Sequence, residues 1–375
     1  MSNIPYNVWN KWDPIKEVIV GSCVNENFFA HIKNKEIKEK LTKLLVETQE
    51  DLDNFADVLS KHGAKVHRPY VDPNVRMNPD KKQKRLQMIA TQPRDDIGVL
   101  GNNIFFSNSV GGEATPPAVE LYKKTLGKDN VVEDAKEPWV QLLRKKITCT
   151  LPNWTLVGKD LFIDEYTEGR SPLREQSTTK NLINDFSEIK EGINRNMLFK
   201  LRNNIAEWIP NTEVHMIKIG GHNDACFHTC KPGVIVSLID IQNYNETFPK
   251  WDVLGIAPEN KWWEILTPFM EAKRLTKGKY WIPGEEKNEP LLQFINSWLD
   301  EWVGYAEETV FDVNMFMINE STACVSNYNK DVFDFFKKHK IEPIIVPLRH
   351  RFFWDGGLHC CSADLVREGD QQSYI

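Results

Sequence analysis

Short runs of β-branched and aromatic residues recur along the whole chain and alternate with segments of helical periodicity. The clearest runs, each four residues long, span residues 17–20, 103–106, 160–163, 233–236 and 343–346. Apolar residues at helical spacing cover residues 34–62, with Gly63 placed to end that helix, and a shorter helical pattern covers residues 332–339. Strands that alternate with helices in this way predict an α/β or mixed fold.

A weak internal repeat is superimposed on this alternation. In each copy a polar residue precedes a turn signal and a second apolar strand. The polar residues are Asp95, Asn153, Asp224 and Asn314, and Cys360 closes the series near the C-terminus. The intervals between them are 58, 71, 90 and 46 residues, so the repeat has no fixed period and is weak support for a repeat architecture.

Length and composition narrow the class of protein. The chain has 375 residues and 41 % hydrophobic content, which allows a substantial core and leaves open one large domain or two smaller ones. A formal net charge of −6 argues against a nucleic-acid binder, which would carry a clustered basic excess. No apolar run approaches the roughly 20 residues of a membrane span, and the first residues lack the features of a secretory signal. We therefore expect a cytoplasmic protein that binds neither nucleic acid nor membrane.

The cysteines are candidates for chemistry rather than for crosslinking. Seven cysteines in so long a chain are too few and too irregular for a disulfide scaffold, so we expect free thiols. Cys360 follows Gly356-Gly357-Leu358-His359, and such glycines permit close backbone approach to a nucleophilic thiol. A cysteine is more often a small buried hydrophobic residue, and the adjacent Cys361 is a candidate for that role.

A second segment alternates histidines, a carboxylate and cysteines. The residues at every second position are His222, Asp224, Cys226, His228 and Cys230. On a strand they would all project from one face, but His222 and Cys230 would then lie about 26 Å apart, too far to share a metal ion. Because Pro232-Gly233 and the apolar run after them favour a strand over a helix, we expect no metal site here.

His222 and Cys360 remain as a candidate pair. A cysteine nucleophile and its histidine partner are usually far apart in sequence and adjacent in the fold. The residues alone support equally well the alternative that His222 is a structural histidine.

The segment between residues 245 and 305 contains half of the 12 tryptophans. We interpret it as an inserted, well-packed subdomain. A lid or an oligomer contact is the alternative, because aromatic residues are favoured at interfaces as well as in cores.

Four ordered motifs link these segments to a known family. They are Trp9-Asn10-Lys11-Trp12-Asp13-Pro14, Pro93-Arg94-Asp95 before Gly101-Asn102, His222-Asn223-Asp224-Ala225-Cys226-Phe227 before Pro232-Gly233, and Gly356-Gly357-Leu358-His359-Cys360. Together they resemble the arginine:glycine amidinotransferase family of the guanidino-group-modifying superfamily. The resemblance runs from about residue 8 to the C-terminus and is weakest in the tryptophan-rich segment.

The resemblance implies a single catalytic domain over residues 1–375, with the tryptophan-rich segment at about 245–305 as an insertion. Its fold would be a five-bladed, pseudo-symmetric α/β propeller of ββαβ units around a polar central site. Each unit would contribute one polar residue to the centre, which accounts for the irregular repeat. The resemblance also suggests a homodimer, and it implies no cofactor and no metal.

The implied reaction begins with attack of Cys360 on the guanidinium carbon of L-arginine, which releases L-ornithine and leaves an amidino group on sulfur. His222 would protonate the leaving amine and then deprotonate the acceptor. Asp95 and Asp224 would hold the planar cation through paired charge-assisted hydrogen bonds. An amine acceptor completes the transfer, and glycine as acceptor gives guanidinoacetate.

Several positions depart from the family pattern. Asn153 stands where the family has the aspartate that orients its catalytic histidine, and no arginine follows Ser237 where the family binds the substrate carboxylate. The serine pair expected upstream of Asn314 falls at Glu307-Glu308, so Glu308 and Asn314 are candidate substrate-binding residues. These positions lie where substrate and acceptor would be recognised. They affect the predicted identity of the acceptor more than that of the donor.

Water in place of the amine acceptor gives the alternative functions. An arginine hydrolase would release ornithine and urea, and a deiminase would release citrulline and ammonia. A non-catalytic propeller, as in the ribosome anti-association factor of this fold, is a third reading. The joint presence of the cysteine, the histidine and two aspartates argues against it.

Overall fold

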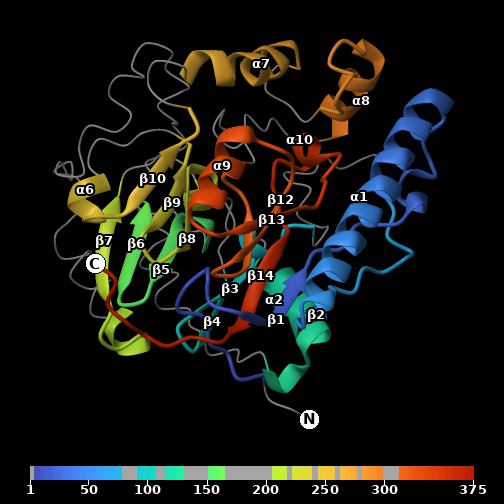
Figure 1. Ribbon diagram of the computed structural model, residues 1–375. Coiled ribbons are helices and arrows are strands. Elements are labelled where there is room, and N and C mark those ends of the chain that lie inside the picture. Colours follow the sequence, from blue (N-terminus) through green and yellow to red (C-terminus); the bar gives the residue numbers. More distant parts are fainter. Residues whose placement is uncertain are drawn as a thin grey trace, which may run out of the picture.

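The computed structural model describes residues 4–77, 91–106, 115–130, 151–164, 205–217, 222–238, 244–257, 262–276, 281–298 and 312–375. These residues form five small sheets with helices between them, so the predicted α/β class is confirmed (Figure 1). Within these ranges, no helix is long and apolar enough to cross a membrane.

Four of the five described sheets share one arrangement, in which an antiparallel strand pair is extended by a strand added in parallel. Three of these pairs are hairpins: β5 (Trp154–Val157) with β6 (Asp160–Asp164), β8 (Phe227–Lys231) with β9 (Val234–Ser237), and β11 (Phe316–Asn319) with β12 (Thr322–Val325). The fourth pair joins the two ends of the chain, β14 (Ser362–Arg367) with β1 (Ile15–Val20). The parallel strands are β2 (Lys65–His67), β7 (Glu213–Ile217), β10 (Asp252–Gly255) and β13 (Glu342–Ile345). The described part of the remaining sheet is the hairpin of β3 (Ile97–Leu100) with β4 (Asn103–Phe106).

The irregular polar repeat coincides with these antiparallel strand pairs. Each of its residues lies one to three positions before a strand of one pair: Asp95, Asn153, Asp224, Asn314 and Cys360. The repeat therefore places a polar side chain at the same end of all five strand pairs.

The long N-terminal helix lies close to the predicted range 34–62. α1 (Lys35–Lys61) is capped by Asn34, whose side chain accepts a hydrogen bond from the backbone of Ile37 (3.2 Å), and Gly63 follows it with a φ of 88°. α9 (Lys330–Lys338) starts two residues before the predicted range 332–339 and is capped in the same way by Asn329. The other helices are α2 (Thr115–Leu126), α5 (Asn223–Cys226), α6 (Tyr244–Thr247), α7 (Trp262–Leu275), α8 (Glu289–Trp298) and α10 (Arg351–Trp354). Short 3₁₀ turns are η1 (Glu26–Phe29), η3 (Pro93–Asp95), η4 (Lys128–Asn130) and η5 (Leu151–Asn153).

The largest core cluster lies between α1, β1 and β11 and continues under the loop that carries the C-terminal cysteines. The ring of Phe55 from α1 meets that of Phe316 from β11 edge to face, with 5.6 Å between centroids. Cys361 belongs to the same cluster, so the prediction that it is a buried core residue is confirmed. The tryptophan-rich segment contains β10, α7 and α8, and Figure 1 shows α7 and α8 at one end of the molecule.

The first and last strands of the chain pair with each other. β1 and β14 run antiparallel, with Val20 opposite Ser362 and Val18 opposite Asp364. Arg367 at the end of β14 is buried, donates to Asp364 (3.0 Å) and lies over the ring of Phe316. These contacts fix the strand that directly follows Cys360.

Candidate active site

Cys360 lies at the end of a tight loop between α10 and β14. The loop is docked on Asn314, because Leu358 donates its backbone N–H to the Asn314 carbonyl (3.1 Å). A Cβ at Gly357 would lie 2.7 Å from the Asn314 Cβ and 2.8 Å from its carbonyl oxygen. Only glycine therefore allows this approach, which explains Gly357 in the glycine pair that precedes the thiol.

Asn314 holds the Cys360 thiol directly. Its Oδ1 accepts the backbone N–H groups of His359 (3.0 Å) and Cys360 (3.1 Å). Its Nδ2 donates to Cys360 Sγ (3.0 Å) and to the carbonyl of Asp224 (3.3 Å). Asn314 therefore connects two other members of the polar repeat and orients the sulfur.

Asp224 is the carboxylate next to the sulfur. Its Oδ2 accepts the S–H of Cys360 (3.5 Å) and the Nδ1–H of His359 (2.7 Å). Its Oδ1 is buried and has no hydrogen-bond partner within the described part of the chain. All three side chains are at most 5 % exposed, so the interaction is sheltered from water.

Burial and charge set the protonation of this group. Burial opposes ionisation of Asp224, but the hydrogen bond from His359 and the electrostatic influence of His222 and Lys11 outweigh it and lower its pKa. Burial lowers the pKa of His359 to about 3, so the imidazole that donates to Asp224 is neutral. Burial raises the pKa of the Cys360 thiol well above its ordinary value, and the charge of Asp224 raises it further. The resting site therefore holds a thiol beside an ionised carboxylate.

Asp95 ends η3 and is buried, and its negative charge also raises the pKa of Cys360. The preceding residue, Arg94, fastens η3 to the cysteine loop. Its Nε donates to the carbonyls of His359 (3.1 Å) and Ser362 (3.0 Å), and its Nη2 donates to Asp364 (3.1 Å). Both aspartates predicted to hold a cation are thus close enough to Cys360 to act on it electrostatically.

Asn153 and His222 lie on segments that contact the rest of the candidate site. Asn153 is buried in η5, which contacts both η3 and α5. His222 is half-buried and directly precedes α5, and its carbonyl accepts from Ala225 (3.0 Å). The orientation of His222 by Asn153, and its partnership with Cys360, stay predictions. Glu308 lies outside the described residues.

The segment from His222 to Cys230 is not one continuous strand. Residues 223–226 form α5, and β8 begins only at Phe227. The short helix turns Asp224 toward Cys360, whereas His228 on β8 is completely buried with its ring edge-on to His359 (5.4 Å between centroids). The alternation of polar residues therefore does not mark one face, because the backbone changes period within it.

Two site residues were not singled out from the sequence. His359 was quoted only as part of a motif, and its position next to the cysteine was the one available signal. Lys11 is 8 % exposed, and its Nζ lies 3.5 Å from the Thr155 hydroxyl. Burial lowers the pKa of Lys11 to about 8, and the charges of Asp224 and Cys360 act in the opposite direction.

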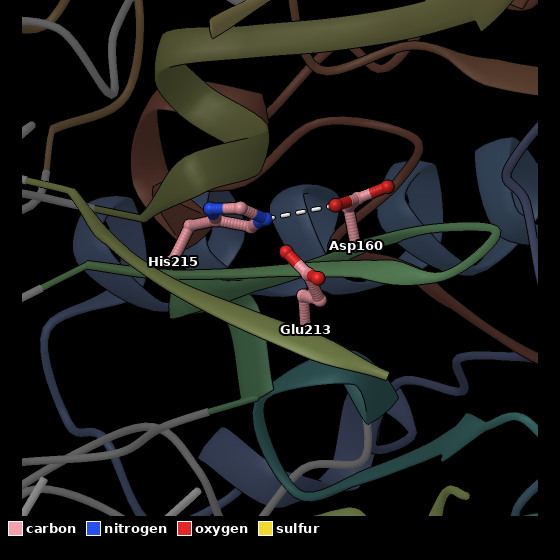
Figure 2. Close-up of side chains that lie close together, drawn as sticks. All are labelled: Asp160, Glu213 and His215. Carbon is pink, nitrogen blue, oxygen red and sulfur yellow. Dashed lines mark hydrogen bonds and ion pairs between the residues drawn. The ribbon is translucent and has the colours of Figure 1, made fainter. Parts of the chain in front are cut away.

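A separate group of side chains could hold a metal ion. Ligand atoms of Asp160, Glu213 and His215 lie within 4.8 Å of one another, and Figure 2 shows them converging from β6 and β7. His215 Nε2 pairs with Asp160 Oδ1 at 2.8 Å, and its ring stacks on Phe162. These contacts account for the positions of Asp160 and His215 without a metal, so we assign no ion here.

Known proteins resemble this chain in sequence. No family model matches the chain. It is 24 % identical over 415 residues to glycine amidinotransferase, mitochondrial, from Xenopus tropicalis, covering 99 % of this chain and 85 % of the relative. It is 21 % identical over 418 residues to L-arginine:L-lysine amidinotransferase from Pseudomonas savastanoi pv. phaseolicola, covering 99 % and 97 % respectively.

Solved structures share the fold over nearly the whole chain. An amidinotransferase of the saxitoxin biosynthetic pathway from Microseira wollei matches with a TM-score of 0.61 at 17 % identity, covering 99 % of this chain and 100 % of that one. Dimethylarginine dimethylaminohydrolase from Pseudomonas aeruginosa matches with a TM-score of 0.51 at 10 % identity, covering 94 % and 100 %. Across almost its whole length the chain is therefore similar in sequence to amidinotransferases, and these relatives indicate that it is an enzyme.

Proposed function

We propose that this enzyme takes the amidino group of L-arginine onto Cys360 and passes it to an amine, giving L-ornithine and a guanidino product. The observation that carries the proposal is the Oδ1 atom of Asp224, which is buried beside the thiol and lacks a partner within the described ranges. An ionised carboxylate left half-satisfied in a dry site favours a cationic ligand that carries N–H donors.

A guanidinium group fits this requirement. It is planar and always charged, and it presents parallel N–H groups that match a carboxylate. Asp224 and Asp95 are two buried acids whose charges both act on Cys360. A guanidinium held between them would bring its central carbon within reach of the sulfur.

The same cation would activate the nucleophile. In the resting site the pKa of Cys360 is raised by burial and by Asp224 and Asp95, so the thiol is protonated. A bound guanidinium cancels the charge of these carboxylates and favours the thiolate. We therefore expect the thiol to lose its proton only when substrate is present, which protects it from other electrophiles.

The reaction would proceed in two balanced steps. The thiol proton moves to His222, the sulfur forms a bond to the guanidinium carbon, and the bond from that carbon to the ornithine nitrogen breaks as His222 returns the proton to it. An acceptor amine then attacks the same carbon and gives its proton to His222, and the carbon–sulfur bond breaks as His222 passes that proton to the sulfur, which restores the Cys360 thiol. No oxidant or metal is needed for either step.

The five described sheets support a finer proposal for the fold. Each has an antiparallel strand pair preceded by one residue of the polar repeat, and Asn314, Asp224 and Cys360 are in mutual contact. We propose that the sheets are the blades of a five-bladed propeller around this centre. The homodimer and the cytoplasmic location stay predictions.

Hydrolysis is the second candidate. The fold is shared with dimethylarginine dimethylaminohydrolase, and residues 238–242, directly after Ser237, contain no arginine to bind a substrate carboxylate in the expected way. Water would then replace the amine in the second step.

Product analysis separates these functions. Purified enzyme is incubated with arginine, with and without glycine, and ornithine, guanidinoacetate, urea and citrulline are quantified by mass spectrometry. We expect guanidinoacetate or another guanidino product only when an amine is added, and none from Cys360→Ala. Urea with ornithine in the absence of an amine identifies a hydrolase, and citrulline identifies a deiminase. Absence of any Cys360-dependent product from guanidino donors contradicts the proposal.

A further inference from the structure

We propose that His359 is a positioning residue of this site, which fixes Asp224 through one oxygen and leaves the other oxygen for the guanidinium. The inference rests on the proposed function, and it assigns a role to a residue that acts through Asp224.

The two carboxylate oxygens of Asp224 differ in their hydrogen-bond partners. Oδ2 receives both available donors, His359 Nδ1 at 2.7 Å and Cys360 Sγ at 3.5 Å. Oδ1 receives none from the described residues. His359 is itself held by its own backbone, which donates to Asn314 Oδ1 (3.0 Å). The imidazole therefore sets the rotation of the carboxylate and with it the position of the open oxygen.

The imidazole is suited to this task because it donates without adding charge. Groups that face it from the surrounding elements are Arg94 on η3, Lys11 in the N-terminal segment, Asp224 at α5, Asp364 on β14 and His228 on β8. Burial, followed by the charges of Arg94 and Lys11, lowers the pKa of His359 to about 3. A lysine or arginine in its place would pair with Asp224 and compete with the substrate cation. The neutral ring leaves the negative charge available.

Loss of this donor would act on Asp224 directly. Burial alone raises the pKa of that carboxyl, and the hydrogen bond from His359 is the largest opposing influence. Without it, part of the Asp224 population would be protonated at low to neutral pH, and a protonated carboxyl does not bind a cation as an ion pair.

Binding of arginine to the inactive Cys360→Ala enzyme, measured by calorimetry from pH 5 to 8, tests the proposal. His359→Asn keeps an N–H near the position of Nδ1, whereas His359→Leu removes it. We expect His359→Leu to weaken binding by about tenfold or more, most strongly at low pH, since a hydrogen bond to a charged group is lost. His359→Asn should restore most of the affinity, and the exposed control His31→Leu should bind like the parent. Equal affinities and pH profiles for folded His359→Leu and its parent would overturn the proposal.

A second measurement does not depend on substrate. In ¹⁵N-histidine NMR, the His359 signal, identified by its loss in His359→Asn, should show the Nδ1–H tautomer and should not titrate between pH 5 and 8. A protonated ring in that range, or the Nε2–H tautomer, contradicts the role of His359. Failure of the parent to bind any guanidino compound, with the expected NMR result, would instead refute the proposed function.

Discussion

At the scale of single residues, the site is shaped by charges buried without full compensation. Lys11 is the clearest case, because its ammonium group has three donors and its hydrogen bond within the described ranges is a long one to the neutral Thr155. Burial lowers the pKa of Lys11 to about 8, and Arg94 adds to this, while Asp224 and Asp364 oppose it. A buried cation of this kind costs stability.

Lys11→Met tests that cost. The folded protein releases the Lys11 proton near pH 8 and the unfolded chain near 10.5, so the unfolded chain binds more protons between these values and stability rises with pH across this window. Below pH 8 the full penalty, up to about 3 kcal/mol, is present. We therefore expect Lys11→Met to be more stable than the parent at pH 7, with the difference disappearing by about pH 10.5.

Denaturant unfolding of both proteins at a series of pH values gives this difference, and the exposed Lys159→Met is the control. A difference that is independent of pH, or a Lys11→Met variant less stable than the parent, would show that the ammonium group is stabilised by partners other than those named.

At the scale of elements, the sequence predicted the parts that carry strong local signals. α1 and α9 each combine an apolar stripe with an asparagine cap, and the five apolar runs all became strands. The short helix α5 was missed, because four residues are too few for a helical pattern and the polar alternation there imitates a strand. That helix is what turns Asp224 toward the sulfur, so the error fell at the site.

The docking of the cysteine loop on Asn314 gives a prediction at this scale. Gly357→Ala would place a methyl group 2.8 Å from the Asn314 carbonyl oxygen. This oxygen belongs to the backbone just before β11, which cannot easily move away. We expect a loss of about 1 to 3 kcal/mol in the free energy of unfolding, and a larger loss of turnover because Asn314 and Cys360 move apart.

Thermal unfolding and product formation measure the two effects. Gly98→Ala is the matched control, since its nearest neighbour is the movable side chain of Leu151 at 3.3 Å. Normal turnover by Gly357→Ala would show that the close approach is not needed for activity.

At the scale of the whole molecule, the irregular repeat coincides with five antiparallel strand pairs but does not show how they meet. Local patterns carry no information on the pairing of β1 with β14, whose residues are separated by almost the whole chain. The sequence also could not place Asp224 against Cys360, because their contact depends on Asn314, which touches both. The resemblance to the amidinotransferases predicted which residues belong to one site. The contacts in the structure indicate the roles of Asn314 and His359 within it.

The proposed function depends on one step, the transfer of the amidino group of arginine to Cys360. Enzyme mixed with arginine labelled with ¹³C in the guanidino carbon, without an acceptor, is quenched in acid, digested and sequenced by tandem mass spectrometry. We predict the labelled amidino group on Cys360, its loss when an amine acceptor is added before the quench, and no label in Asp224→Asn. Ornithine production with the label absent from Cys360, or present on Cys361 instead, would contradict the account.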